Sequence, residues 1–238
     1  MKESRADQIM MMATGAYIGK RIRLVAGSVP RLSTPVLFAA NHPTTLDPLL
    51  LQYALKLSYS SLLTEAAFAL PLVRAVLLGA RHVPVGEKGS GGKALIERAA
   101  ETARSGRPLA IFPEGCLCPG PGIAPLRSGA VRIAATARLP IVPVGIAASS
   151  EGIKEVSMML GGKLETGRYL LHGWYVVRVG RPISFDISPD DRLAVEACTG
   201  ELGLALKHQA GEAQALLAIL EGREEEAADA FSIVKASS

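Results

Sequence analysis

The sequence predicts an α/β fold in which a mostly parallel β-sheet is flanked by helices on both faces. Short apolar runs alternate with segments of helical periodicity from residue 35 onward, an order typical of parallel sheets. Apolar residues make up 49% of the 238 residues, which is enough for a sheet buried on both sides. No run of 18 or more apolar residues occurs, so we expect no membrane-spanning helix.

The chain opens with an apolar segment at residues 9–19, followed by Lys20, Arg21 and Arg23. This segment is shorter than a bilayer-spanning helix, and cations stand where a signal peptide would be cut. Two interpretations remain: a helix lying in a membrane surface, or an amphipathic helix packed on the core. We assign residues 1–34 to a short N-terminal amphipathic helix at the membrane surface and a linker.

Residues 35–187 are predicted to form the α/β domain. Apolar and β-branched residues concentrate in runs of strand length, and the longer segments between these runs have helical spacing. The expected strands are 36–40, 61–65, 82–85, 109–112 and 141–146, with a further strand, parallel or antiparallel, within 175–185. The expected helices are about 48–57, 67–78, 93–104 and 128–138.

The segment Ser188-Pro189-Asp190-Asp191 predicts the start of a helix. Serine is a favoured N-cap, proline is favoured at the first helical position, and acidic residues favour the first turn. We therefore expect a C-terminal helical extension over residues 188–238, whose periodicity fades after about residue 222.

The body of the chain is more basic than its net charge of +4 indicates. Residues 1–185 hold 22 Lys and Arg against 11 Asp and Glu, whereas residues 186–238 hold 4 against 11. A basic body favours an anionic partner, such as an acidic membrane surface or a phosphorylated cosubstrate. Aromatic residues make up only 5% and do not alternate with the basic ones, so nucleic acid is not an expected partner.

The three cysteines do not form the framework of a secreted disulfide protein. Cys116 and Cys118 are too close in sequence for an ordinary disulfide, and Cys198 leaves an odd number. The usage of cysteine therefore predicts a reducing, cytoplasmic location.

Polar residues follow three of the predicted strands at their carboxyl ends. Parallel strands bring these ends to one edge of the sheet, where α/β proteins bind their ligands. The loops are Asn41 to Asp47, the range 86–93 that contains Lys88, and Pro113 to Gly115. We expect them to form one shared site.

His42 and Asp47 are the candidates for catalysis in the first loop. On a continuous helix, side chains five residues apart diverge by about 140°, and Pro43 and Pro48 exclude such a helix. A turn would let Asp47 reach the imidazole, fix its tautomer and stabilise the imidazolium. Asp47 could instead be the N-cap of a helix with Pro48 at its first position, and the two roles are compatible.

Four motifs in this order resemble the glycerolipid acyltransferase superfamily, whose members acylate glycerol 3-phosphate or lysophosphatidic acid. They are Asn-His-Pro-Thr-Thr-Leu-Asp at 41–47, Phe-Pro-Glu-Gly at 112–115, Arg-Ser-Gly-Ala at 127–130 and Ile-Val-Pro-Val-Gly-Ile at 141–146. The resemblance covers about 110 residues. It implies a glycerol-3-phosphate acyltransferase-like fold and an O-acyltransferase of phospholipid biosynthesis.

In such an enzyme His42 would be the general base on the acceptor hydroxyl, held by Asp47. The donor would be acyl-CoA or acyl-carrier protein, the acceptor a lysolipid, and the location the cytoplasmic face of an anionic membrane. No metal and no bound cofactor are implied. The residues expected to bind substrate are Asn41, Thr44, Arg81, Lys88, Glu114, Gly115, Arg127, Ser128 and Gly129, the last two at a helix N-terminus that stabilises negative charge.

The chain departs from the family pattern at two arginines associated with the phosphate of the acceptor. Cys116-Leu117-Cys118 replaces Thr-Arg-Ser after the glutamate motif, and Gly86 follows the Val-Pro-Val strand, with Lys88 as a displaced substitute. Lysophosphatidic acid remains the favoured acceptor. A lysolipid with another headgroup and a non-glycerol acceptor are the alternatives.

Other interpretations stay open. The protein could bind lipid or an acyl carrier without catalysis, or Cys116 could form a thiol acyl-enzyme with His42 as base. Residues 69–80 fit either the core or an acyl-chain groove. The loop at 86–93 lacks the Lys-Ser/Thr pair of a P-loop and is expected to be a linker.

Overall fold

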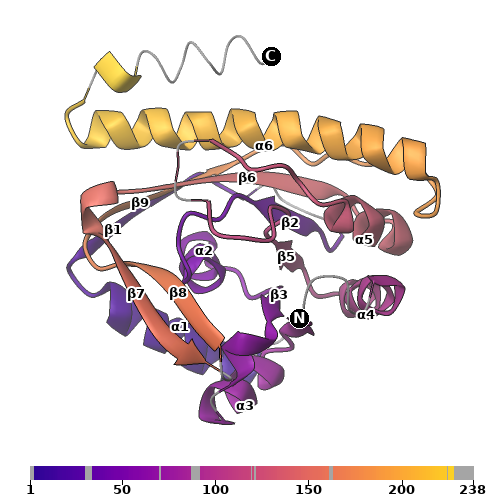
Figure 1. Ribbon diagram of the computed structural model, residues 1–238, viewed down its shortest axis with the longest axis horizontal. Coiled ribbons are helices and arrows are strands. Elements are labelled where there is room, and N and C mark those ends of the chain that lie inside the picture. Colours follow the sequence, from indigo (N-terminus) through magenta and orange to yellow (C-terminus); the bar gives the residue numbers. More distant parts are fainter. Residues whose placement is uncertain are drawn as a thin grey trace.

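The computed structural model describes residues 3–29, 34–69, 71–86, 92–118, 120, 122–160, 163–223 and 225–227. Its centre is a seven-stranded sheet with the order β1-β9-β6-β2-β5-β3-β4 (Figure 1). The strands are β1 (Ile22–Ala26), β2 (Leu37–Ala40), β3 (Ser60–Thr64), β4 (Val83–Val85), β5 (Leu109–Ile111), β6 (Ile141–Ala148) and β9 (Gly173–Val179). The predicted α/β class is confirmed.

Strands β2 to β6 are parallel to one another, which brings the carboxyl ends of β2, β4 and β5 to one edge. β9 runs antiparallel to β6, and β1 runs parallel to β9. The central strand β2 is buried on both faces, as the apolar runs predict. Residues 22–26 were expected to belong to a linker, but they form β1, because they pair with β9 at the edge of the sheet.

Helices cover both faces of the sheet. They are α1 (Arg5–Ile18), α2 (Asp47–Leu55), α3 (Pro71–Gly79), α4 (Gly92–Arg104), α5 (Gly129–Ala137) and α6 (Arg192–Leu220), with short 3₁₀ turns η1 (Glu65–Phe68) and η2 (Ser150–Gly152). Side chains of α4, α5 and α6 share one apolar core with Leu37 and Ala39, whereas α1 and α2 share another with Phe38 and Ala40. Figure 1 shows α6 on one side of the sheet and α1 and α2 on the other.

Helix α1 is attached to the core at its first turn. Ser4 and Asp7 form a capping box, in which each side chain accepts from the backbone of the other. The buried Asp7 carboxylate also accepts from the Arg107 guanidinium at 3.1 and 2.5 Å. The helix is thus packed on the core here, although Ile9 and Met12 on its outer side are exposed. The interpretation of a helix packed on the core is confirmed, and the membrane-surface interpretation stays a prediction for the exposed face of α1.

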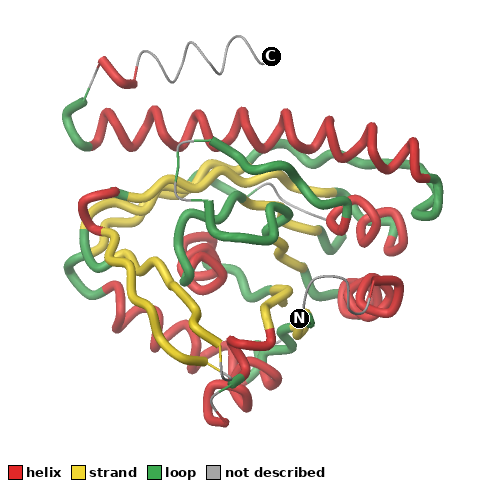
Figure 2. Tube along the Cα trace, viewed as in Figure 1, coloured by secondary structure: helices red, strands yellow, loops and turns green. Residues whose placement is uncertain are grey.

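A two-stranded hairpin, β7 (Ile153–Leu160) and β8 (Lys163–Leu170), lies outside the main sheet. The pairing runs from Ile153 opposite Leu170 to Leu160 opposite Lys163. Figure 2 shows its two strands, in yellow, leading away from the main sheet toward the lower edge of the view. This hairpin was not predicted from the sequence.

The C-terminal helix begins three residues later than the sequence predicts. Asp191, not Ser188, is the N-cap of α6, and its carboxylate accepts from the backbone N–H of Ala194. Ser188 forms a turn instead, because its carbonyl accepts from the N–H of Asp191 and its hydroxyl from that of Asp190. The predicted loss of periodicity after residue 222 concerns a stretch that, apart from 223 and 225–227, lies outside the described ranges.

None of the helices within the described ranges combines the length and the apolar character needed to cross a membrane.

Candidate active site

Two of the three predicted loops meet at the carboxyl edge of the sheet. β2 leads into the turn from Asn41 to Asp47, which we call the catalytic turn, and the neighbouring β5 leads into the turn from Phe112 to Gly115. The third loop follows β4 at the same edge of the sheet. Residues 87–91 of that loop, including Lys88, lie outside the described residues.

The predicted contact between His42 and Asp47 is present. The Nδ1 atom of His42 lies 2.8 Å from Oδ2 of Asp47, and the histidine side chain is 18% exposed while the aspartate is fully buried. Asp47 is the first residue of α2, with Leu46 at the N-cap position, so the N-cap interpretation of Asp47 is wrong. Its carboxylate points back into the turn that precedes the helix.

The Asp47 carboxylate accepts from three donors besides the imidazole. They are the Thr44 N–H at 2.8 Å, the Thr44 hydroxyl at 2.6 Å and the Tyr175 hydroxyl at 3.1 Å. A carboxylate bound in this way acts as acceptor only, so the proton between the two side chains sits on His42 Nδ1. The lone pair of Nε2 is therefore left for a substrate proton.

Tyr175 is a part of the site that was not predicted from the sequence. It lies on β9, 128 residues beyond Asp47, and is fully buried. Burial, and after it the nearby Asp47 carboxylate, raises the pKa of Tyr175 well above its usual value. The phenol therefore stays protonated and donates to Asp47. No spacing in the sequence links a residue so far away to the catalytic turn.

Glu114 fixes the backbone of His42. Its carboxylate accepts from the His42 N–H at 2.9 Å and from the Ala124 N–H at 2.7 Å, and the side chain is buried. The His42 carbonyl accepts from the Cys118 N–H, and the imidazole stacks on Phe112 with ring centroids 4.3 Å apart. The two turns are therefore held together through His42.

Asn41, Thr44 and Glu114 were predicted to bind substrate, but all three are buried and have internal partners. The Asn41 amide donates to the Ile146 carbonyl at 2.9 Å and accepts from the Ile146 N–H at 2.6 Å. Thr44 binds Asp47, and Glu114 binds two backbone N–H groups. These residues position the catalytic turn, because their polar atoms are engaged within the protein.

Gly115, Arg127, Ser128 and Gly129 lie together beside this turn. Gly115 has a φ of +67°, and a Cβ added there would lie 2.7 Å from the Arg127 guanidinium. Arg127 is exposed, its N–H donates to the Pro113 carbonyl at 2.8 Å, and α5 begins two residues later. The structure thus brings a cation and a helix N-terminus to the Phe112–Gly115 turn.

Two other arginines differ from expectation. Arg81 precedes β4, so it lies at the opposite edge of the sheet from His42 and is not brought to the site. Arg168, which the sequence analysis missed, lies on β8 and donates from Nε to the Pro43 carbonyl at 3.2 Å. Arg168 also pairs with Glu155 across the hairpin.

The thiols near the site are bound to backbone oxygens. Cys116 Sγ lies 3.7 Å from the Glu114 carbonyl oxygen, and Cys118 Sγ lies 3.6 Å from that of Gly122. Burial, and then Glu114, raises the pKa of Cys118, which disfavours its thiolate. Within the described residues no hydrogen bond joins Cys116 to His42.

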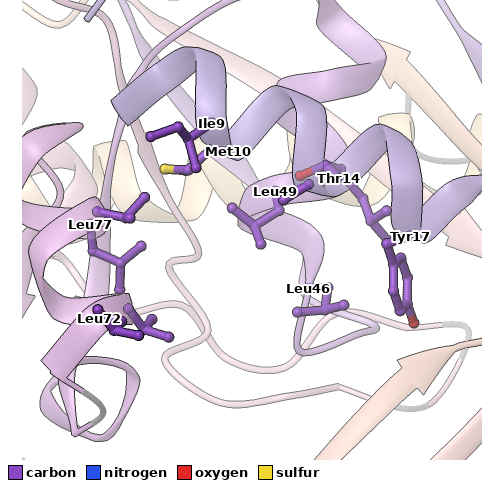
Figure 3. A pocket seen from close by; sticks show the side chains of 12 residues that line it. Ile9, Met10, Thr14, Tyr17, Leu46, Leu49, Leu72 and Leu77 are labelled. Carbon is purple, nitrogen blue, oxygen red and sulfur yellow. The ribbon is translucent and has the colours of Figure 1, made fainter. Parts of the chain in front are cut away.

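An apolar cavity of about 370 Å³ lies between α1, α2 and α3 (Figure 3). Its wall contains Leu46, the residue before Asp47, so the cavity adjoins the catalytic turn although His42 is not among its lining residues. The lining residues are Ile9, Met10, Ala13, Thr14, Tyr17, Leu46, Leu49, Leu50, Leu72, Val73, Val76 and Leu77. We call this cavity the apolar groove.

Comparison with known proteins places the chain among acyltransferases. The model of the Acyltransferase family matches residues 21–147. The chain is 28% identical over 124 residues to a 1-acyl-sn-glycerol-3-phosphate acyltransferase from Borreliella burgdorferi, covering 51% of this chain and 49% of the relative. The chain thus spans about half the length of that curated relative.

A solved structure shares the fold. The crystal structure of the 1-acyl-sn-glycerophosphate (LPA) acyltransferase PlsC from Thermotoga maritima superimposes with a TM-score of 0.61 at 15% sequence identity. The match covers 87% of this chain and 77% of the other.

Proposed function

The chain belongs to the Acyltransferase family, and we propose that it moves a fatty acyl group from a thioester donor to a hydroxyl of a lysolipid. The favoured acceptor is lysophosphatidic acid, and the donor is acyl-CoA or acyl-carrier protein. The observation that carries this proposal is the His42–Asp47 pair, which leaves Nε2 of the imidazole available for a proton.

In the proposed reaction His42 Nε2 removes the proton of the acceptor hydroxyl as its oxygen attacks the thioester carbonyl. Asp47 stabilises the imidazolium that forms, and such general base catalysis contributes roughly 10²- to 10⁴-fold in rate. The tetrahedral intermediate then expels the thiolate of the donor, which takes the proton from His42. The products are the acylated lipid and the free thiol, and no acyl-enzyme is formed.

The apolar groove supports a substrate with a hydrocarbon chain. Leu77 is buried, whereas Leu72 and Val73 at the start of α3 are exposed and also line the groove. Of the two interpretations of residues 69–80, this arrangement favours an acyl-chain groove. Leu46 would bring the chain close to the catalytic turn, which suits a reaction at the carbonyl end of an acyl group.

An anionic headgroup on the acceptor is supported by the cations beside the two turns. Arg127 is exposed next to Gly115, and Arg168 borders Pro43. These arginines lie near the positions at which this chain lacks the two arginines of the family pattern, so we retain lysophosphatidic acid as acceptor. The basic body and the exposed residues of α1 support action at the inner face of the cell membrane.

The test is to incubate the purified protein with acyl-CoA and acyl-carrier donors and a panel of lysolipids, and to identify products by mass spectrometry. We expect acylated lysophosphatidic acid from the wild type and a rate at least about 10³-fold lower for His42→Ala. Cys116→Ala is the matched control and should keep its rate, because the mechanism uses no thiol. A protein that binds lipid but never releases the donor thiol would contradict the proposal.

A further inference from the structure

The outer half of the β7–β8 hairpin is exposed on both of its faces. Met159 and Leu164 lie directly opposite each other in the register and are 65% and 69% exposed; we call them the tip pair. Met158, on the other face, is also exposed. An isolated two-stranded ribbon is marginal in water, and clustered exposed apolar side chains mark interaction sites. The tip of the hairpin is therefore a surface made for a partner.

The hairpin face that carries the tip pair changes in polarity along its length. Nearest the catalytic turn it bears the ion pair of Glu155 and Arg168, and next the hydroxyls of Ser157 and Thr166, which lie 2.9 Å apart. The tip pair follows, roughly 13 Å beyond the ion pair at the rise of a β-strand. An order of charged, hydroxyl and apolar groups over this length matches the passage from lipid headgroups to acyl chains.

The base of the hairpin is bound to the catalytic turn. The Thr45 N–H donates to the Arg168 carbonyl, and the Arg168 N–H donates to the Thr45 hydroxyl, both at 2.8 Å. At the end of β8, the Tyr17 hydroxyl of α1 donates to the Leu170 carbonyl at 2.7 Å. The hairpin is thus held in one orientation relative to His42 and to the apolar groove.

Other exposed apolar residues lie toward the same side of the molecule. In Figure 1 the free end of the hairpin and α3 both lie at the lower edge. Leu72 on α3 is 84% exposed, the cation Arg74 on the same helix is also exposed, and Ile9 and Met12 are exposed on α1. Leu72 and Ile9 also line the apolar groove. The described charged side chains of the hairpin balance, Lys154 and Arg168 against Glu155 and Glu165, so the preference for an anionic bilayer over a protein partner comes from the basic body of the chain and from Arg74 on α3.

We propose that the β7–β8 hairpin is a membrane-docking arm. Its tip pair enters the interface of an anionic bilayer, and its base thereby directs the catalytic turn toward an acceptor that resides in that bilayer. This inference rests on the proposed function, because it assumes that the acceptor is a lipid.

The first test measures binding of the full chain to vesicles of phosphatidylcholine with phosphatidylglycerol, by co-sedimentation. We expect Met159→Glu with Leu164→Glu to lower the partition coefficient at least about tenfold, since two apolar contacts are lost and two anions are added. Met159→Ser with Leu164→Ser removes the apolar contacts without adding charge, and it should lower the partition coefficient about fivefold. Circular dichroism checks that both variants are folded.

The matched control is Leu193→Glu on α6. Leu193 is 79% exposed, like the tip pair, but it lies on the opposite side of the sheet from α1 and α2. The control should bind vesicles as the wild type does. Failure of the wild type to bind, or equal binding by the wild type and both tip variants, would overturn the docking arm, and so would an equal loss in the control.

The second test separates the arm from the reaction. The rate is measured with a long-chain acceptor held in vesicles and with a short-chain acceptor dissolved as monomers. The tip variants should lose at least about tenfold with vesicles and keep the monomer rate. A wild type inactive on both acceptors would contradict the proposed function instead. Normal vesicle binding with a loss confined to acyl-carrier donors would assign the tip to the carrier and overturn the docking arm.

Discussion

At the catalytic turn a single buried carboxylate organises the reacting side chain. Asp47 accepts hydrogen bonds from Thr44, Tyr175 and His42. None of these partners is a lysine or arginine, so hydrogen bonds alone compensate the negative charge of the carboxylate. A buried charge is tolerated only when its oxygens are bonded in this way. The orientation of the imidazole therefore depends on every donor to Asp47.

Tyr175→Phe removes one of these donors and keeps the ring. We expect kcat to fall about tenfold, corresponding to about 1.5 kcal/mol for a hydrogen bond to a charged group, with little change in KM. Steady-state kinetics measure the two constants. Tyr59→Phe is the control, because this buried hydroxyl donates to the Pro48 carbonyl at 2.8 Å and not to Asp47. An unchanged kcat in Tyr175→Phe would show that Asp47 does not need this donor.

Gly115→Ala tests the turn beside His42. The φ of +67° is strained for alanine, and the new Cβ would meet the Arg127 guanidinium at 2.7 Å. We expect a loss of about 1–2 kcal/mol in the free energy of unfolding, together with lower activity. Urea unfolding measures the first quantity.

Gly200→Ala within α6 is the matched control for this glycine, since a Cβ there meets nothing within 4 Å. It should raise the free energy of unfolding by about 0.5–1 kcal/mol. Equal effects of the two substitutions would contradict the assignment of strain to position 115.

Sequence reasoning predicted the contact of His42 with Asp47, because the two prolines leave only a turn in which the side chains can meet. It could not find Tyr175 or Arg168, which bind the catalytic turn from 128 and 123 residues away. Asn41, Thr44 and Glu114 were also assigned to substrate, because a motif gives a residue its place in the chain but not the direction of its side chain.

Among the elements, α1 is secured by an ion pair that lies entirely in the interior. Arg107 binds Asp7 and also donates to the Ser60 hydroxyl and the Tyr59 carbonyl. Removal of one member of a buried pair leaves the other charge without compensation, which costs more than the pair contributes. The first turn of α1 is therefore part of the folded core.

Asp7→Asn should lower the free energy of unfolding by about 3–5 kcal/mol, because Arg107 stays buried without its anion. Urea unfolding followed by circular dichroism measures this change. Glu97→Gln is the control: Glu97 pairs with Arg104 at 2.8 Å, but both side chains are about half exposed. That variant should lose less than about 1 kcal/mol. If Asp7→Asn lost as little unfolding free energy as Glu97→Gln, water would have to reach the Arg107 guanidinium.

The elements most clearly predicted were those with continuous apolar runs, such as β2 and β6, which are buried on both faces. β1 and the hairpin were missed because their exposed or half-buried strands mix polar and apolar residues. For the hairpin a signal was present: Gly161-Gly162 separates two runs of strand-forming residues, as in a tight turn between paired strands. The start of α6 was misplaced because Ser188 satisfies the rule for an N-cap but forms a turn.

For the molecule as a whole, charge and exposed apolar residues are distributed unequally. The segment that contains α6 is acidic, since the described residues between 186 and 227 include 3 basic and 9 acidic ones, and α6 lies on the side of the sheet away from α1. The basic remainder carries the apolar groove and the hairpin. An anionic surface would therefore attract the basic remainder of the chain more strongly than the segment that contains α6.

The stability of the whole chain should depend on pH through His82. Burial, and then the Arg107 guanidinium, lowers the pKa of His82 to about 4 from its usual 6.5, while Asp7 opposes the shift. The unfolded chain takes up a proton below pH 6.5 and the folded chain does not. The contribution of neutral His82 to the free energy of unfolding is thus complete above pH 6.5 and is lost as the pH falls toward about 4.

His82→Asn removes this titration and leaves an acceptor for the Ser61 N–H that now binds Nδ1. Between about pH 7.5 and about pH 4.5 the wild type should lose about 3 kcal/mol more unfolding free energy than the variant. Urea titrations at both pH values measure this difference. Parallel losses in the two proteins would exclude His82 as the cause. The pKa of Asp7 is lowered as well, but protonation of that carboxyl in the folded chain changes the free energy of unfolding only at lower pH, below 3.8.

Gly145 on β6 links the packing of α6 to the position of the catalytic turn. A Cβ at this position would lie 2.0 Å from the carbonyl oxygen of Gln209, so α6 rests directly on the strand. The adjacent Ile146 holds the Asn41 amide, and Asn41 precedes His42. Any side chain at position 145 would lift α6 and shift the support of the imidazole at once. We therefore expect substitutions of Gly145 to lower turnover although His42 and Asp47 are unchanged. Screens of random variants for lost activity should recover such substitutions.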